Sequence, residues 1–138
     1  MLWRGHLRRD WLEVAGAGSF ALPFAWIFVR MGCVVERAHA GALSDSWLAL
    51  PYPDGSSRWD LALLEMLWAM ALAALFVYWR GRESPAFFAA VMPGTLGLFR
   101  LAVAPLQVGP GAYWGPALLL GWSVFVMWNG MRSPRLLR

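Results

Sequence analysis

The chain has 138 residues, of which 59% are hydrophobic and 14% are charged. A soluble globular domain is about 45–50% apolar and about 25% charged, so one buried core does not account for this many apolar residues. The composition therefore predicts an integral membrane protein, and the length predicts a single domain over residues 1–138.

The formal net charge is +4, and all twelve basic residues are arginines. They lie between and at the ends of the apolar runs and do not cluster on one polar face, which is typical of residues that set membrane topology. No basic stripe or known reader motif occurs, so the sequence argues against nucleic-acid binding. The single cysteine, Cys33, excludes an intrachain disulfide. No cluster with metal-ligand spacing indicates a metal or another cofactor.

Four apolar runs are candidates to cross a bilayer, which takes about 20 residues of helix. None alternates with the period of two that a barrel strand requires, so the predicted fold class is an all-α bundle of about four transmembrane helices. Pro93 predicts a kink in the third helix, and Gly109-Pro110-Gly111 predicts a turn before the fourth. The segment 36–58, rich in Ser, Pro, Asp and Gly, predicts a loop of turns. The expected helices cover residues 14–35, 59–79, 85–106 and 112–128.

The arginines also predict the orientation of the bundle. An even number of spans places three Arg-rich segments on one side, and the positive-inside rule makes that side the cytoplasm, with both termini there. Loop 36–58 then lies outside. One alternative is a cleavable signal peptide ending near Ala38-His39-Ala40, although Asp10 and Glu13 interrupt its basic start. The Arg-rich segments are Arg4, Arg8 and Arg9, then Arg80 and Arg82, then Arg132, Arg135 and Arg138.

Three charged residues lie inside or at the edge of the apolar runs: Arg30, Glu65 and Arg100. A central Arg or Asp costs about 2.5–3.5 kcal/mol on insertion, so such residues normally face the protein interior and find partners. With the predicted orientation, Glu65 and Arg100 both lie roughly 9 Å below the outer interface, and Arg30 lies near the outer end of its helix. The topology thus predicts one layer that holds all three.

Two arginines and a carboxylate suit the phosphate of a lipid, because a guanidinium binds phosphate through two parallel hydrogen bonds and a carboxylate orients it. Gly97, one turn before Arg100, leaves room there for a close neighbour or a ligand. The competing interpretations are an ionic network that only locks the bundle, or an Arg30 that extends to the interface. Asp60 is expected to cap the second helix.

Residues near the outer end of the first helix could supply proton-transfer chemistry. Glu36 and His39 lie in the outer loop just past Arg30, and either could take a proton from a thiol or an alcohol. The alternative for His39 is an ordinary surface histidine, and for Cys33 a packing residue rather than a nucleophile.

Several motifs resemble the bacterial prolipoprotein diacylglyceryl transferases. Arg30-Met31-Gly32-Cys33 is similar to the family's Arg-Ile-Gly-Asn/Cys signature, and Gly41 falls where its following glycine belongs. The segment 60–65 resembles the next helix start, commonly Gln-Leu-Tyr-Glu, with Glu65 matching the Glu. Gly97-Leu98-Phe99-Arg100 is similar to a Gly-x-x-Arg motif in the penultimate helix.

The resemblance covers roughly residues 10 to 130 and corresponds to the C-terminal half of a typical member. It implies a multi-pass transferase of the bacterial cytoplasmic (inner) membrane that moves diacylglyceryl from phosphatidylglycerol to the cysteine of a preprolipoprotein. It implies that Arg30 and Arg100, with Gly32, Gly41 and Gly97, hold the lipid phosphate and that Glu65 orients an arginine. His39 or Glu36 would then act as the base.

The sequence also departs from the family pattern. The family's N-terminal helices with their His-Gly-Gly motif are not found, and Ala38 and Ala104 stand where acidic residues are expected. These departures keep three other hypotheses open: a partner chain that supplies the missing helices, a degenerate lipid-binding relative, and a non-catalytic membrane subunit. A small transporter is a weaker idea, because no pair of broken helices is visible.

Overall fold

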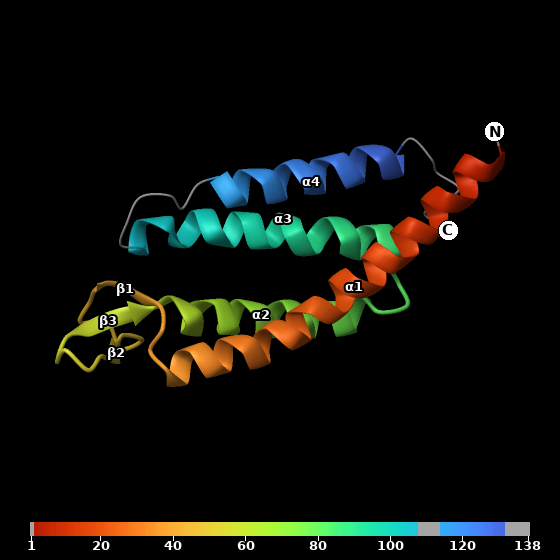
Figure 1. The fold of residues 1–138 in the computed structure, drawn as a ribbon. Helices are drawn as coiled ribbons and strands as arrows, with labels where there is room; N and C mark the ends of the chain where they lie inside the picture. Colours follow the sequence, from red (N-terminus) through yellow and green to blue (C-terminus); the bar gives the residue numbers. More distant parts are fainter. Residues whose placement is uncertain (1, 108–113, 132–138) are drawn as a thin grey trace.

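The computed structural model describes the backbone of residues 2–107 and 114–131, and the side chains within 11–107 and 115–128. These residues form four α-helices, a short 3₁₀-helix and a three-stranded sheet (Figure 1). In chain order the elements are α1 (Leu2–Val35), β1 (Ala40–Leu43), β2 (Leu50–Pro51), β3 (Ser57–Asp60), α2 (Leu61–Trp79), α3 (Pro85–Val103), η1 (Ala104–Leu106) and α4 (Trp114–Met131).

Among the described residues, three helical segments are long and apolar enough to cross a membrane: Trp11–Val35, Leu61–Trp79 and Pro85–Leu106. The three spans therefore lie close to their predicted positions. The apolar part of α4, Gly115–Trp128, is shorter. The predicted start of the fourth helix at 112 and the turn at 109–111 lie outside the described residues. The helix α1 begins at Leu2, twelve residues before the predicted span, because residues 2–13 contain no proline and continue the helix past its apolar part.

Helix α1 lies across both α2 and α3, and α4 lies along α3, whereas α2 and α3 touch each other little (Figure 1). One aromatic cluster joins the first three helices: ring centres of Phe20 and Phe88 are 5.3 Å apart, and those of Phe76 and Phe88 are 5.0 Å apart. Phe76 and Phe88 are buried. Edge-on ring pairs of this kind stabilise a bundle beyond the area they bury.

Small residues bring α3 and α4 close together. A side chain on Gly94 would lie 2.5 Å from Oγ of Ser123, and one on Gly97 would lie 3.0 Å from the carbonyl oxygen of Pro116. The Ser123 hydroxyl donates a hydrogen bond of 2.8 Å to the carbonyl of Ala90. Glycine and serine at a helix contact are typical of membrane bundles, where close backbone approach replaces the hydrophobic effect.

Segment 36–58 is not only turns, so the all-α prediction is wrong there. Its strands form an antiparallel sheet in the order β1-β3-β2. A tight turn closes the β2–β3 hairpin at Gly55, whose φ of +79° suits glycine. Figure 1 shows the sheet beside the start of α2, at the end of the bundle where α1 and α3 finish. Strand β3 takes up Trp59 and Asp60, so α2 begins two residues later than predicted.

Asp60 caps α2, as the sequence predicts. Its Oδ1 accepts a hydrogen bond of 2.9 Å from the amide of Leu63, and its Oδ2 accepts one of 2.9 Å from the hydroxyl of Tyr52. Both Asp60 and Tyr52 are buried. Burial, together with this hydrogen bond, raises the pKa of Tyr52 to about 12. The pair therefore ties the sheet directly to the start of the second membrane helix.

Candidate functional site

Three helices each contribute one charged side chain at the end of the bundle that carries the sheet. Arg30 lies near the end of α1, Glu65 in the second turn of α2, and Arg100 in the last turn of α3. Because α1 and α3 run toward this end and α2 runs away from it, residues far apart in sequence reach the same depth. The structure thus brings together the three charges that the sequence places in one layer.

Glu65 is the centre of this cluster and contacts both arginines. Its Oε2 lies 2.5 Å from Nε of Arg30, and its Oε1 lies 2.8 Å from a terminal nitrogen of Arg100. The Nε–H of Arg30 is buried and does not align as a hydrogen bond within the described part of the chain, so that contact is an ion pair. The side chains of Glu65 and Arg30 are 5% and 12% exposed, and that of Arg100 is 33% exposed. Arg100 is therefore the most accessible of the three charges.

Trp26, on α1, also contacts the cluster. The sequence did not single it out as part of the site. Its indole N–H donates a hydrogen bond of 3.3 Å to Oε2 of Glu65. The guanidinium carbon of Arg30 lies 5.0 Å from the centre of the Trp26 ring, within range of a cation–π contact. The signal in the sequence is the spacing: four residues place Trp26 on the same face of the helix as Arg30.

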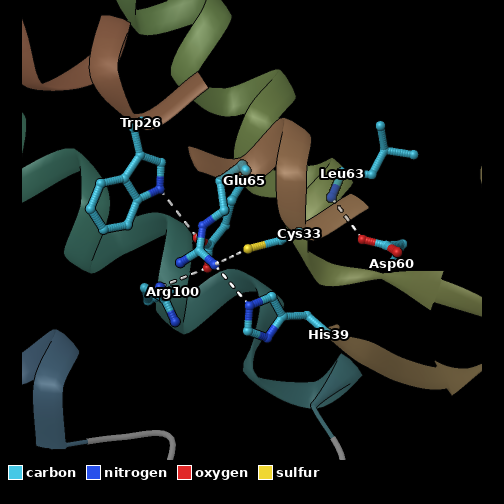
Figure 2. Close-up of polar contacts among 8 residues, drawn as sticks. Trp26, Cys33, His39, Asp60, Leu63, Glu65 and Arg100 are labelled. Carbon is cyan, nitrogen blue, oxygen red and sulfur yellow. Dashed lines mark hydrogen bonds and ion pairs between the residues drawn. The ribbon is translucent and has the colours of Figure 1, made fainter. Parts of the chain in front are cut away.

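His39 approaches the cluster from the segment between α1 and β1. Its Nε2 lies 3.0 Å from NH1 of Arg30, and the same nitrogen of Arg30 lies 4.0 Å from Sγ of Cys33. Figure 2 shows Trp26, Glu65, Arg100 and His39 converging from four directions, while Asp60 and Leu63 lie apart from them. Of the two predicted bases, only His39 reaches the cluster. Glu36 is exposed and does not line the cavity described next.

A cavity of about 280 Å³ lies between the charged cluster and the segment that carries His39. This volume is near the lower end of the range for small-molecule sites, about 300–1,000 Å³. Two guanidinium groups and one carboxylate give its wall a net charge of +1 with the imidazole neutral, which favours an anionic ligand. The lining residues are Arg30, Ala38, His39, Ala40, Leu61, Glu65, Arg100 and Gln107.

The backbone around His39 is held from two sides. The carbonyl of His39 accepts a hydrogen bond of 3.0 Å from the amide of Leu61, and Gly41 pairs with Gln107 at the end of η1. A side chain on Gly41 would lie 2.8 Å from the carbonyl oxygens of both Leu106 and Trp59. Gly41 therefore lets three backbone segments meet, and this fixes the outer wall of the cavity.

None of the three predicted glycines, Gly32, Gly41 and Gly97, lines the cavity itself. Gly97 packs against α4, so a close neighbour and not a ligand occupies its face. Gly32 is exposed, with nothing within 4 Å of the position that a side chain would take. Gln107 does line the cavity and was not predicted, because it lies just past the third predicted helix and carries no recognisable motif.

Within 11–107 and 115–128, no three His, Cys, Asp or Glu side chains gather as a metal site. Comparison with protein-family models, with curated proteins and with solved structures gives no match for this chain.

Proposed function

We propose that this protein binds the phosphate of an anionic glycerophospholipid and transfers its diacylglyceryl group to the cysteine thiol of a preprolipoprotein. The observation that carries the proposal is the Arg30–Glu65–Arg100 cluster on the wall of a cavity at one end of a membrane bundle. Phosphatidylglycerol is the donor that the motif resemblance implies. The cavity then faces the outer side of the bacterial cytoplasmic membrane, with both termini in the cytoplasm.

The shape of the cluster supports phosphate binding. A guanidinium group carries five N–H donors, and a carboxylate has two oxygens. Glu65 uses one oxygen for each arginine, so it holds both guanidinium groups in place without occupying all their donors. Further donors on each arginine can then bind the oxygens of a phosphate in parallel pairs.

The transfer reaction also needs positive charge where these arginines lie. The thiol sulfur attacks the glyceryl carbon next to the phosphate oxygen, so a C–S bond forms while the C–O bond breaks. The departing phosphate monoester gains one negative charge. Fixed guanidinium groups beside that oxygen stabilise the charge as it develops, and donors of this kind contribute about 10²–10³-fold to a rate.

The test is transfer of labelled diacylglyceryl from phosphatidylglycerol vesicles to a lipobox peptide by the purified chain. We expect transfer by the wild type and its loss in Arg100→Ala. The matched control is Arg58→Ala, which removes an arginine from the exposed 3.2 Å ion pair with Asp54, outside the cavity. Equal transfer by Arg100→Ala and the wild type contradicts the proposal.

Binding measurements identify the source of the phosphate. Phosphatidylglycerol vesicles offer the phosphate with its acyl chains, whereas glycerol phosphate in solution offers it without them. We expect the vesicles to bind more tightly, because the acyl chains already lie in the bilayer beside the cavity. Preference for the soluble compound argues against a lipid donor.

A second candidate function is a non-catalytic membrane subunit in which the cluster only joins helices. The burial of Glu65 between two arginines and Trp26 favours it, because buried charges that are fully partnered need no ligand. On this alternative, Arg30→Ala and Arg100→Ala lower stability or assembly, and the folded variant shows no separate loss of lipid binding.

A further inference from the structure

The contact between His39 and Arg30 defines the protonation of the imidazole. Arginine has N–H donors and no acceptor, so in the 3.0 Å contact NH1 of Arg30 donates and Nε2 of His39 accepts. A histidine nitrogen that accepts carries a lone pair, so the ring is neutral and its proton is on Nδ1. The lone pair that could take up a proton is therefore occupied by Arg30 when the cavity holds no anion.

The same guanidinium is one of the two that would bind phosphate. A hydrogen bond from a guanidinium to a phosphate includes the Coulomb attraction between opposite charges, which a bond to a neutral imidazole lacks. A phosphate in the cavity is therefore a better acceptor for NH1 of Arg30 than the neutral imidazole is. Because Arg30 and His39 both line the cavity, an anion can displace His39 from this nitrogen without moving the backbone.

We propose that His39 is the general base of the transfer reaction and that phosphate binding activates it by withdrawing the Arg30 hydrogen bond from Nε2. This inference rests on the proposed function, because it requires a phosphate donor and a thiol acceptor. The thiol S–H bond breaks and its proton goes to Nε2, which gives an imidazolium. The sulfur forms the C–S bond as the C–O bond breaks, and the imidazolium then returns its proton to the phosphate monoester or to water.

The other groups around the cavity cannot fill this role. Glu65 on α2 already contacts Arg30, Arg100 and Trp26. Arg30 on α1 and Arg100 on α3 are permanently protonated, and the amide of Gln107 is not a base. Among the residues that line the cavity, only His39 has a lone pair that ligand binding would release.

The position of His39 also suits a base that must act in a fixed place. Its carbonyl is bound by the amide of Leu61, and two residues later Gly41 is packed between the carbonyls of Leu106 and Trp59. The imidazole can therefore turn from Arg30 toward a thiol while its backbone stays in place. Fixed catalytic groups of this kind avoid the entropy cost of bringing a base to the substrate.

The decisive variant is His39→Gln. Glutamine keeps an oxygen that can accept from Arg30, but it cannot take up a proton. We expect phosphatidylglycerol vesicle binding within about twofold of the wild type and a transfer rate lower by about 100-fold or more, the usual contribution of a general base. The matched control is His6→Gln, the same substitution at the other histidine of the chain, which should transfer at the wild-type rate.

Chemical rescue tests the base directly. His39→Ala leaves space beside Arg30, and added imidazole should restore part of the transfer rate without changing vesicle binding. The His39→Gln rate should also rise with pH as the thiol ionises on its own, more steeply than the wild-type rate. The charged groups that face His39, namely Arg30, Glu65 and Arg100, are the same in both proteins.

The outcomes separate this inference from the proposed function. Normal transfer by His39→Gln overturns the role of His39 and leaves the transferase intact. Loss of vesicle binding together with transfer, with no rescue by imidazole, shows a structural role for His39 and also overturns the inference. A wild-type chain that binds vesicles and transfers nothing overturns both proposals.

Discussion

Helices α1, α2 and α3 are held together in two different ways at two levels. Toward the connection between α2 and α3, Phe88 packs edge-on against Phe20 and Phe76, which stack on each other. At the end that carries the sheet, Arg30, Glu65 and Arg100 join the same helices around a cavity. Packed rings fill space, whereas charges in a low-dielectric setting cost free energy unless each finds a partner. The aromatic level therefore has the features of a packing contact, whereas the charged level lines a cavity that we propose holds an anion.

The largest effect on stability is expected in the aromatic cluster. Phe76→Ala leaves a buried space where three helices meet, and such changes lower the free energy of unfolding by about 3–5 kcal/mol. The measurement is the free energy of unfolding in detergent, compared with Phe125→Ala, which changes an exposed ring. Phosphatidylglycerol binding by the folded Phe76→Ala protein should be unchanged. Impaired binding would show that the two levels are coupled.

The next largest effect is expected for Glu65→Gln. It should lower the free energy of unfolding by about 3 kcal/mol, because it leaves two guanidinium groups without their counter-charge. This loss should be partly recovered in phosphatidylglycerol, whose phosphate replaces the missing carboxylate, and not in a zwitterionic lipid. Thermal unfolding in the two lipids measures the difference. Equal unfolding temperatures in both lipids would mean that no phosphate reaches the arginines.

Gly41→Ala tests the outer wall of the cavity. The new methyl group would lie 2.8 Å from two carbonyl oxygens, and overpacking of this kind costs about 1–3 kcal/mol. Since the displaced segment carries His39, we expect transfer to fall more than vesicle binding. The control is Gly18→Ala, where no atom lies within 4 Å of the added carbon. Wild-type transfer by Gly41→Ala would show that the reaction does not require the backbone beside His39 to be held in this position.

The smallest effect is expected at Tyr52, and it depends on pH. Tyr52→Phe removes one hydrogen bond to Asp60, a loss of about 1 kcal/mol. Because the pKa of Tyr52 rises from 10.0 to about 12 on folding, the folded protein holds this proton more tightly than the unfolded chain. The wild type therefore loses stability between pH 10 and 12, and the difference between the two proteins should shrink there. A difference that stays constant over this range would contradict the raised pKa.

Much of the bundle follows from the sequence, because the length of an apolar run that crosses a membrane is set by bilayer thickness. The meeting of Arg30, Glu65 and Arg100 was predictable for the same reason: each residue's distance from the end of its run gives its depth. The Asp60 cap follows from local chemistry, since a carboxylate just before an apolar run accepts the free amides of the helix start.

The sheet and the details of the cavity could not be predicted. Strands of two to four residues carry too little pattern to be recognised, and these depend on distant contacts such as the pairing of Gly41 with Gln107. The contact of His39 with Arg30 depends on that sheet, because β1 begins one residue after His39. The contact of Trp26 with Glu65 could not be predicted either, since nothing in a single helix shows which tryptophan will meet a carboxylate on another.

The most direct test of the account is transfer of diacylglyceryl from phosphatidylglycerol vesicles to a lipobox peptide, measured side by side for the wild type, Arg100→Ala and Arg58→Ala. The account predicts transfer by the wild type and by Arg58→Ala, and its loss in Arg100→Ala while that protein remains folded. Transfer by all three proteins alike, or by none of them, would contradict the assignment of this cavity as a lipid-phosphate site that carries out the reaction.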